Sequence, residues 1–303
     1  MSHTTNQARS RAATAQRTSI ALRWGSIALV LAILAMLIVI KLTASHTGGA
    51  AAPATQPASA ALAREVTEIP SKVFDTVGVT APASSLAVPI KIADQPELKG
   101  TSTSGTQVPE VLYFGANWCP FCAAERWALA ASLSRFGTFH HLWITSSTLS
   151  DVFPGTPTLS FERVRYASRY LAFDPVERST NISSPAGGYT SLMVPTSAES
   201  AEVKRYDAAA FVGRQAAGSI PFISIANHYL VSGAGYSPSI LAGLTRTQIA
   251  DNLRDPHNPV TQAIVATSNY LSATICDATG NNPGSVCSSP GVHAAQASMA
   301  RTR

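Results

Sequence analysis

Two cysteines, three positions apart, lie where a strand-like segment passes into a helix-like one. Residues 108–116 are mostly apolar and rich in strand formers. A Cys-x-x-Cys motif at 119–122 follows, and residues 123–136 then place apolar side chains near helical spacing, up to Gly137, a suitable helix end. The sequence therefore predicts a strand, a tight turn and a helix that begins at the motif, as in α/β folds.

This position favours redox chemistry. A thiolate at a helix N-terminus faces unpaired backbone N–H groups and the positive end of the helix dipole, which lowers its pKa. We therefore expect Cys119 to be the attacking sulfur and Cys122, one turn further into the helix, to be the resolving thiol. Pro120 is tolerated in the first helical turn, where its missing N–H would have no partner.

Two other interpretations of the motif remain open. Half of a zinc site has the same spacing, but a second close cysteine pair is then needed, and Cys276 and Cys287 are eleven residues apart. The motif could also form a purely structural disulfide. A redox-active dithiol accounts best for the strand-to-helix setting, and we expect no metal.

Residues 114–122, with a tryptophan directly before the first cysteine, resemble the active-site segment of thioredoxin-fold proteins. A second landmark of that fold, a cis-proline that enters a strand facing the motif, is matched by Ile220-Pro221 within residues 218–225. The resemblance implies that Cys119, Cys122 and Pro221 act in catalysis. It further implies substrate contacts at the positions that flank these residues, namely Trp118, Pro120, Phe121 and Ile220. A proline that merely starts an edge strand is the simpler alternative for Pro221.

More narrowly, residues 114–137, 146–161 and 168–177, together with an apolar N-terminal segment, resemble the membrane-anchored family described as domain of unknown function 929. The resemblance covers roughly residues 70–275. It implies a thioredoxin-like fold and an extracytoplasmic location, and it brings little established activity.

The chain departs from the thioredoxin pattern in two ways. Thioredoxins keep a buried carboxylate six residues before the first cysteine, whereas this chain has Tyr113 there. Glu125 is the better candidate for a proton relay, although a glutamate exposed on a helix surface is the commoner case. The 102 residues from Cys119 to Pro221 also exceed a minimal core, so we expect an insertion between the active-site helix and the cis-proline strand, at about residues 148–200.

The C-terminal region holds the other two cysteines. A disulfide between Cys276 and Cys287 would close a loop of about eleven residues and stabilise the fold by roughly 2–3 kcal/mol. A structural disulfide is the prediction, and a second redox pair that exchanges electrons with the motif is the alternative. The remaining residues, 278–303, are expected to form a loop and a frayed tail.

The N-terminal region predicts a membrane anchor. Residues 24–40 contain no charge, and with the next four they approach the roughly 20 residues that span a bilayer. Four arginines precede this run, so the positive-inside rule places a basic tail at 1–23 in the cytoplasm, an anchor at 24–44 and the rest outside the cell membrane. A cleaved signal peptide is the competing interpretation.

We expect a flexible stalk at 45–68, because small residues, proline and threonine dominate its first part, and an extracytoplasmic domain at 69–277. The net charge of +5 forms no stripe along the chain, which argues against nucleic acid as a partner.

The sequence thus predicts a membrane-anchored thiol–disulfide oxidoreductase that acts on thiols or disulfides of exported proteins. It needs no bound cofactor, and a partner protein would supply the redox equivalents. The compartment favours an oxidase or isomerase over a reductase. The alternative is a non-enzymatic thioredoxin-like module, such as a metal or haem-assembly chaperone with His228 as an extra ligand.

Overall fold

The computed structural model describes residues 55–80 and 87–301. The predicted basic tail, the predicted anchor at 24–44 and the first part of the predicted stalk lie outside these residues. Within the described part of the chain, no helix is both long and apolar enough to cross a bilayer.

A mixed six-stranded sheet forms the centre of the fold, with strand order β2-β13-β12-β4-β3 among the described residues. Strand β9 pairs in parallel with the second half of β4, on the same edge as β3, while the other pairs are antiparallel. The strands are β2 (Ile90–Lys91), β3 (Lys99–Thr101), β4 (Gln107–Gly115), β9 (Ala172–Glu177), β12 (Phe222–Ile225) and β13 (Tyr229–Ser232). The predicted strand before the motif is therefore the central strand of the sheet.

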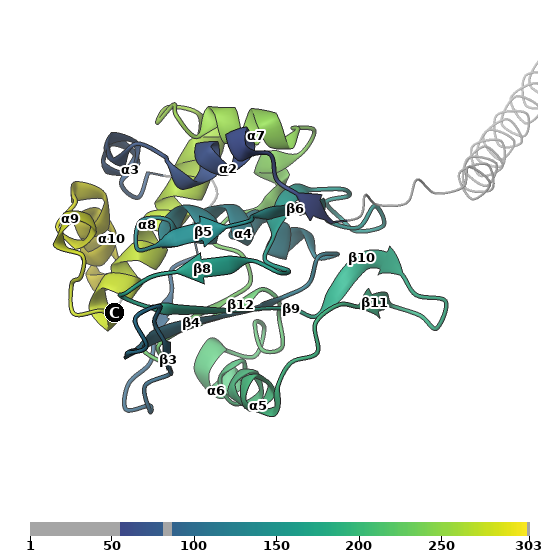
Figure 1. Ribbon diagram of the computed structural model, residues 1–303, viewed down its shortest axis with the longest axis horizontal. Helices are drawn as coiled ribbons and strands as arrows, with labels where there is room; N and C mark the ends of the chain where they lie inside the picture. The colour runs from purple at the N-terminus through teal and green to yellow at the C-terminus, as the bar shows by residue number, and fades with distance from the viewer. Residues whose placement is uncertain (1–54, 81–86, 302–303) are drawn as a thin grey trace, which may run out of the picture. The chain divides into compact units, whose positions relative to one another are not determined.

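Both faces of this sheet are covered by helices (Figure 1). Along β4, Val111 and Tyr113 belong to one hydrophobic core, and Leu112 and Phe114 belong to a second, as the two-residue period of a strand requires. The first core lies under α4 (Pro120–Leu133) and α8 (Pro259–Ala278), and the second under α5 (Ser197–Tyr206) and α6 (Ala209–Val212). Because it is covered on both faces, β4 is almost wholly buried beyond Glu110.

Helix α4 begins at the cysteine motif, and all of its residues except Phe121 are buried. Its N-cap is Cys119, Pro120 occupies the first turn, and the helix packs against α8 and against β7 (Pro157–Ser160). Five of its fourteen residues are alanine, whose small side chain allows this close approach. The predicted strand–turn–helix segment is confirmed.

Short strands form two small sheets, and all of these strands except β1 lie between α4 and β9 in the chain. One consists of β1 (Gln56–Pro57), β6 (Trp143–Ser146) and β7, and the other of β5 (Thr138–His140) and β8 (Arg165–Ala167). A hairpin of β10 (Ser179–Ser183) and β11 (Tyr189–Ser191) follows β9. The segment 148–200, expected to be an insertion, therefore also contributes β9, a strand of the main sheet.

The segment 45–68 is not a stalk over its described part. Helix α2 (Ala60–Thr67) buries Val66 completely and packs against α4 and α7 (Arg246–Asn252). Its N-cap, Ser59, accepts the Leu62 N–H, and α3 (Ser71–Val77) follows. Alanine-rich composition suggested a linker, but alanine is also the best helix former, and tertiary contacts decide between the two.

The C-terminal tail, expected to fray, is also ordered. After the short helix α9 (Gly284–Cys287), α10 (Pro290–Arg301) packs against α3 and α8 and buries Val292 and Ala295. One further element, the 3-10 turn η1 (Pro238–Leu241), contacts α4 and α8. The domain therefore extends on both sides beyond the predicted limits of 69–277.

Candidate active site

Two hydrogen bonds of Cys119, one to its sulfur and one from its backbone N–H, hold the cysteine turn. The Cys119 Sγ accepts the Cys122 backbone N–H at 3.2 Å, as an N-cap side chain does. The Cys119 N–H in turn donates to the Ala116 carbonyl at 3.3 Å. The sulfur therefore lies at the positive end of α4, as predicted.

The two thiols are free, and their surroundings separate their acidities. The pKa of Cys119 is lowered, first because the Cys122 thiol hydrogen-bonds to it, and also through backbone N–H groups and the Arg126 guanidinium, although burial opposes the shift. The pKa of Cys122 is raised well above its ordinary value, mainly by burial and then by Cys119. Cys119 is thus the better nucleophile and Cys122 the proton-holding thiol, although Cys119 is itself only 3% exposed.

The Ile220-Pro221 peptide bond is cis and lies against the cysteines. The Cys119 thiol donates to the Ile220 carbonyl across 3.6 Å. This contact follows from the sheet: β12 begins directly after Pro221, and its first residue, Phe222, pairs with Phe114 near the end of β4. Pro221 directly precedes a strand of the sheet interior, which lies between β4 and β13, and not an edge strand.

The residues predicted to contact a substrate differ in exposure. Phe121 is 39% exposed and packs edge-on against Phe153, whereas Pro120 is buried. Trp118 is half-buried, stacks on Tyr189 with ring centroids 5.1 Å apart, and donates its indole N–H to Ser179. Ile220 is half-buried. Phe121, Trp118 and Ile220 therefore offer surface beside the dithiol, and Pro120 offers little.

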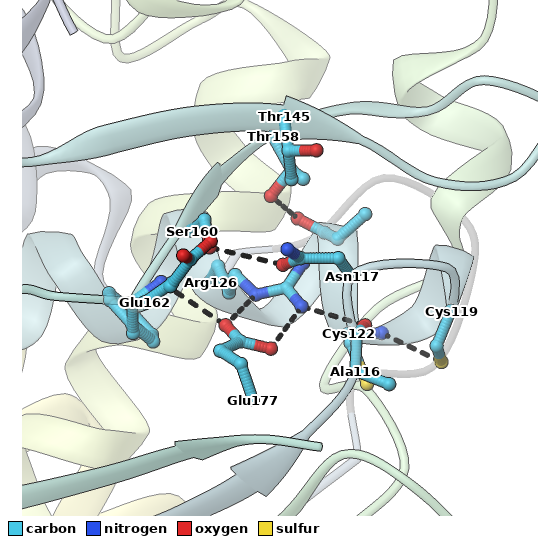
Figure 2. A network of polar contacts seen from close by, with 12 residues as sticks. Ala116, Asn117, Cys119, Cys122, Arg126, Thr145, Thr158, Ser160, Glu162 and Glu177 are labelled. Atoms are coloured by element: carbon cyan, nitrogen blue, oxygen red, sulfur yellow. Dashed lines mark hydrogen bonds and ion pairs between the residues drawn. The ribbon is translucent and has the colours of Figure 1, made fainter. Parts of the chain in front are cut away.

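A buried ion pair lies beside the dithiol, and sequence reasoning missed it (Figure 2). Arg126 donates from Nε and Nη2 to the two carboxylate oxygens of Glu177, each at 2.7 Å, and both side chains are fully buried. Glu177 is the last residue of β9 and pairs with Gly115, so the parallel register brings it to the motif. An arginine in a mostly apolar helix was the available signal, but its partner is 51 residues away.

Glu125 is placed on another side of α4. It is fully buried, so the interpretation as a surface residue is wrong. Its Oε2 accepts the Gly235 N–H at 2.7 Å, and burial raises its pKa to about 7. Among the described residues, neither of its oxygens bonds to a cysteine, and Oε1 has no hydrogen-bond partner. The structure thus does not bring the proposed relay residue to the thiols.

Tyr113, at the position where thioredoxins hold a carboxylate, is buried beneath the motif. The Arg126 guanidinium lies 5.9 Å from the centre of its ring. Its hydroxyl has no hydrogen-bond partner within the part of the chain that the structure describes, and burial raises its pKa well above the ordinary value. Tyr113 is therefore a neutral, apolar neighbour of the ion pair at physiological pH.

The other cysteines form the expected disulfide, with Cys276 and Cys287 Cα atoms 5.5 Å apart. It lies at the far end of the sheet from the dithiol. Next to Cys276, Asp277 accepts the Tyr229 hydroxyl, and Tyr229 pairs with Ile225, the end of β12 remote from Pro221. The arrangement fits a structural crosslink better than a redox pair that exchanges electrons with Cys119.

No group of three or more histidine, cysteine or acidic side chains in the described residues is arranged to hold a metal ion. In a comparison with protein families, the family described as Domain of unknown function (DUF929) matches residues 98–277. No curated protein matches the chain, and no solved structure matches it.

Proposed function

Because the chain belongs to the DUF929 family, whose description assigns no activity, we propose a function from the site itself. We propose that the protein is a membrane-anchored, extracytoplasmic thiol–disulfide oxidoreductase with a thioredoxin-like fold. Its Cys119–Cys122 dithiol would exchange disulfides with exported proteins.

The strand topology supports the thioredoxin-like fold. Within the main sheet, the run β9-β4-β12-β13 has β9 parallel to β4 and the other two pairs antiparallel. Helix α4 follows β4, and α5 and α6 connect β9 to β12. The thioredoxin core has this strand order, with a dithiol after its first strand and a cis-proline before its third.

The observation that carries the activity is the environment of one sulfur. The Cys119 Sγ accepts the Cys122 N–H at 3.2 Å, and the carbonyl of the cis Ile220-Pro221 bond lies 3.6 Å away. The first contact favours the thiolate, which is the reactive form. The second places a strand end beside the sulfur, where an extended substrate backbone would lie.

The exchange then follows in two steps. The Cys119 thiolate attacks one sulfur of a substrate disulfide, a mixed disulfide forms, and the other substrate sulfur leaves as a thiolate that takes up a proton. Cys122 loses its proton and attacks the Cys119 sulfur, which releases the second substrate thiolate together with that proton. Two electrons pass from the dithiol to the substrate. In reverse, the Cys119–Cys122 disulfide oxidises two substrate thiols.

Sequence and structure support the location together. The apolar run at 24–40 with arginines before it favours an anchor with the domain outside. The Cys276–Cys287 disulfide is also typical of an oxidising compartment. A partner protein of that compartment or membrane would then return the dithiol to its starting state.

The test is a trapping experiment in the host cell. The variant Cys122→Ser cannot resolve a mixed disulfide, so we expect substrate proteins to accumulate on Cys119 as adducts that disappear on reduction. Non-reducing gels and mass spectrometry identify them. The matched control, Cys119→Ser, keeps the second cysteine and should trap nothing.

The purified full chain provides the second measurement. It should reduce insulin or oxidise a reduced model protein, and the double variant Cys119→Ser/Cys122→Ser, which keeps the other disulfide, should do neither. A wild type as inactive as this double variant, together with an empty trap, contradicts an oxidoreductase. Stoichiometric binding of Cu(I) in place of exchange would favour the metal-chaperone alternative.

A further inference from the structure

The Arg126–Glu177 pair is connected to the dithiol by backbone as well as by charge. Arg126 Nη2, besides meeting Glu177, donates to the Ala116 carbonyl at 2.7 Å. The same carbonyl accepts the Cys119 N–H. One oxygen therefore joins the guanidinium to the residue that carries the reactive sulfur (Figure 2).

The two members of the pair are not equally satisfied. Glu177 accepts both arginine nitrogens and also the Phe161 N–H at 3.1 Å. Arg126 keeps a fully buried Nη1 without a hydrogen-bond partner among the described residues. A buried, unbonded donor on a charged group is costly, and such groups tend to be retained where they have a functional use.

Few other ionisable groups face the guanidinium. Tyr113 of β4 lies over it and is neutral, Glu177 comes from β9, and α4 itself supplies the two cysteines. Nearby Glu162 pairs instead with Arg163. β7 contributes hydroxyl groups: Ser160 donates to Asn117, and Thr158 donates to the Ala123 carbonyl. Arg126 is thus the positive charge closest to the thiols on this side.

We propose that Arg126 is the positioning residue of the dithiol: anchored by Glu177, it fixes the Ala116–Cys119 turn and supplies the positive charge that stabilises the cysteine thiolates. This inference rests on the proposed exchange reaction. Glu177 holds the guanidinium in place, and its own negative charge partly offsets the effect on the sulfurs. Thioredoxins have a buried carboxylate six residues before the first cysteine. This chain has the neutral Tyr113 at that position, and the Arg126 guanidinium lies against its ring.

The direction of each pKa agrees with this arrangement. Burial opposes a charge on Arg126, but Glu177 outweighs it and raises the arginine pKa, so the guanidinium stays charged. Arg126 in turn lowers the pKa of Cys119 and opposes the burial that raises the pKa of Cys122. During the exchange, the negative charge rests first on Cys119 and then on Cys122, and the same cation serves both steps.

The test uses two single variants with opposite expected effects. Arg126→Met removes the cation, and we expect the pKa of Cys119 to rise by about one unit. Glu177→Gln keeps the volume and removes the anion, and we expect the pKa of Cys119 to fall by less, about half a unit, because the guanidinium acts on this sulfur more directly than the carboxylate does. We measure the pKa of Cys119 in both variants from thiolate absorbance and from the rate of alkylation as a function of pH, with the full chain in its reduced form. At a pH below the pKa, a shift of one pKa unit changes the thiolate fraction of Cys119 tenfold.

If the Arg126–Glu177 pair had a purely structural role, the two variants would not shift the pKa of Cys119 in opposite directions. Shifts in the same direction, or no shift in either variant, overturn the proposal. If a single variant does not fold, the double variant Arg126→Met/Glu177→Gln removes both charges and should raise the pKa of Cys119 by less than one unit. An unchanged pKa in that variant also contradicts the proposal.

A matched control is available on the same helix-and-turn segment. Arg135, just beyond α4, is also largely buried, but it bonds to Asn269, Ser272 and Ser289. It lies sixteen residues from Cys119, so Arg135→Met should leave the pKa of Cys119 unchanged. Reduction of insulin by the wild type separates the proposed exchange reaction from the proposed role of Arg126. If the pKa of Cys119 shifts in opposite directions in the two variants but insulin is not reduced, only the oxidoreductase is contradicted. If insulin is reduced but the pKa of Cys119 does not shift, only the positioning role is contradicted.

Discussion

The two cysteine pairs of this protein are both buried, yet their surroundings differ. Cys119 and Cys122 are free thiols at the start of α4, beside a buried ion pair and a cis-proline. Cys276 and Cys287 form a disulfide that links the end of α8 to α9, and neither sulfur has a charged side chain bonded to it in the described residues.

The difference shows what separates a free cysteine pair at a helix start from a crosslink. A disulfide across three positions within one helical turn constrains little of the fold, so it can open and close. A disulfide across eleven positions fixes two helices. Charges and backbone N–H groups around Cys119 set its acidity, whereas the other pair contributes mainly through the chain that it closes.

The largest expected effect is at the ion pair beside the dithiol. Arg126→Met leaves Glu177 charged, buried and unpaired, so we expect the free energy of unfolding to fall by about 3–5 kcal/mol. Chemical denaturation of the full chain measures it. Arg126→Met/Glu177→Leu, which removes both charges, should recover most of this loss. Equal losses in the single and double variants would show that packing, and not charge, holds this region.

The next effect concerns Glu125, to which no positively charged side chain of residues 55–80 and 87–301 bonds. Burial raises its pKa from 4.5 to about 7, so the folded protein keeps a proton that the unfolded chain releases near pH 4.5. The free energy of unfolding therefore falls as the pH rises from about 4.5 to about 7, by about 3 kcal/mol, and stays lowered above that.

Glu125→Gln removes this titration, so the variant should gain stability over the wild type across that pH range. Denaturation curves at several pH values give the difference. Glu110→Gln is the control: burial and neighbouring acids raise the pKa of Glu110 to about 7 as well, but its carboxyl is only about half-buried, so the gain should be smaller. A constant difference between Glu125→Gln and the wild type at all pH values would rule out a neutral Glu125.

The smallest effect is expected at the crosslink. Replacing Cys276 and Cys287 together by alanine should lower the free energy of unfolding by about 2–3 kcal/mol, the loop-closure value for eleven residues. The pKa of Cys119 and the insulin activity should not change. A shift in either would show that the two cysteine pairs are coupled, and would favour the alternative of a second redox pair.

Much of the local structure near the motif could be predicted from the sequence. A strand-rich run, a Cys-x-x-Cys turn and an apolar helix are near-neighbour patterns, and they predicted β4, the start of α4 and Cys119 at its N-cap. The Ile220-Pro221 step and the Cys276–Cys287 pair were also found, because proline and cysteine leave distinctive signals at single positions.

Composition was a weaker guide at the two ends of the domain. Residues 55–68 and 288–301 are rich in small side chains, which predicted a stalk and a frayed tail. Helices α2 and α10 nevertheless form there, since α4, α7 and α8 offer surfaces on which Val66 and Val292 become buried. Short helices draw most of their stability from such packing.

The sequence by itself therefore determined where the two free thiols lie and that a helix begins at them, because these properties depend on residues a few positions apart. Only the tertiary structure decided which charged residue of α4 faces the thiols. Glu125 and Arg126 are neighbours in the sequence, but a helix turns them about 100° apart. The parallel pairing of β9 with β4 then brings Glu177 to Arg126 from 51 residues away, a contact that no local pattern records.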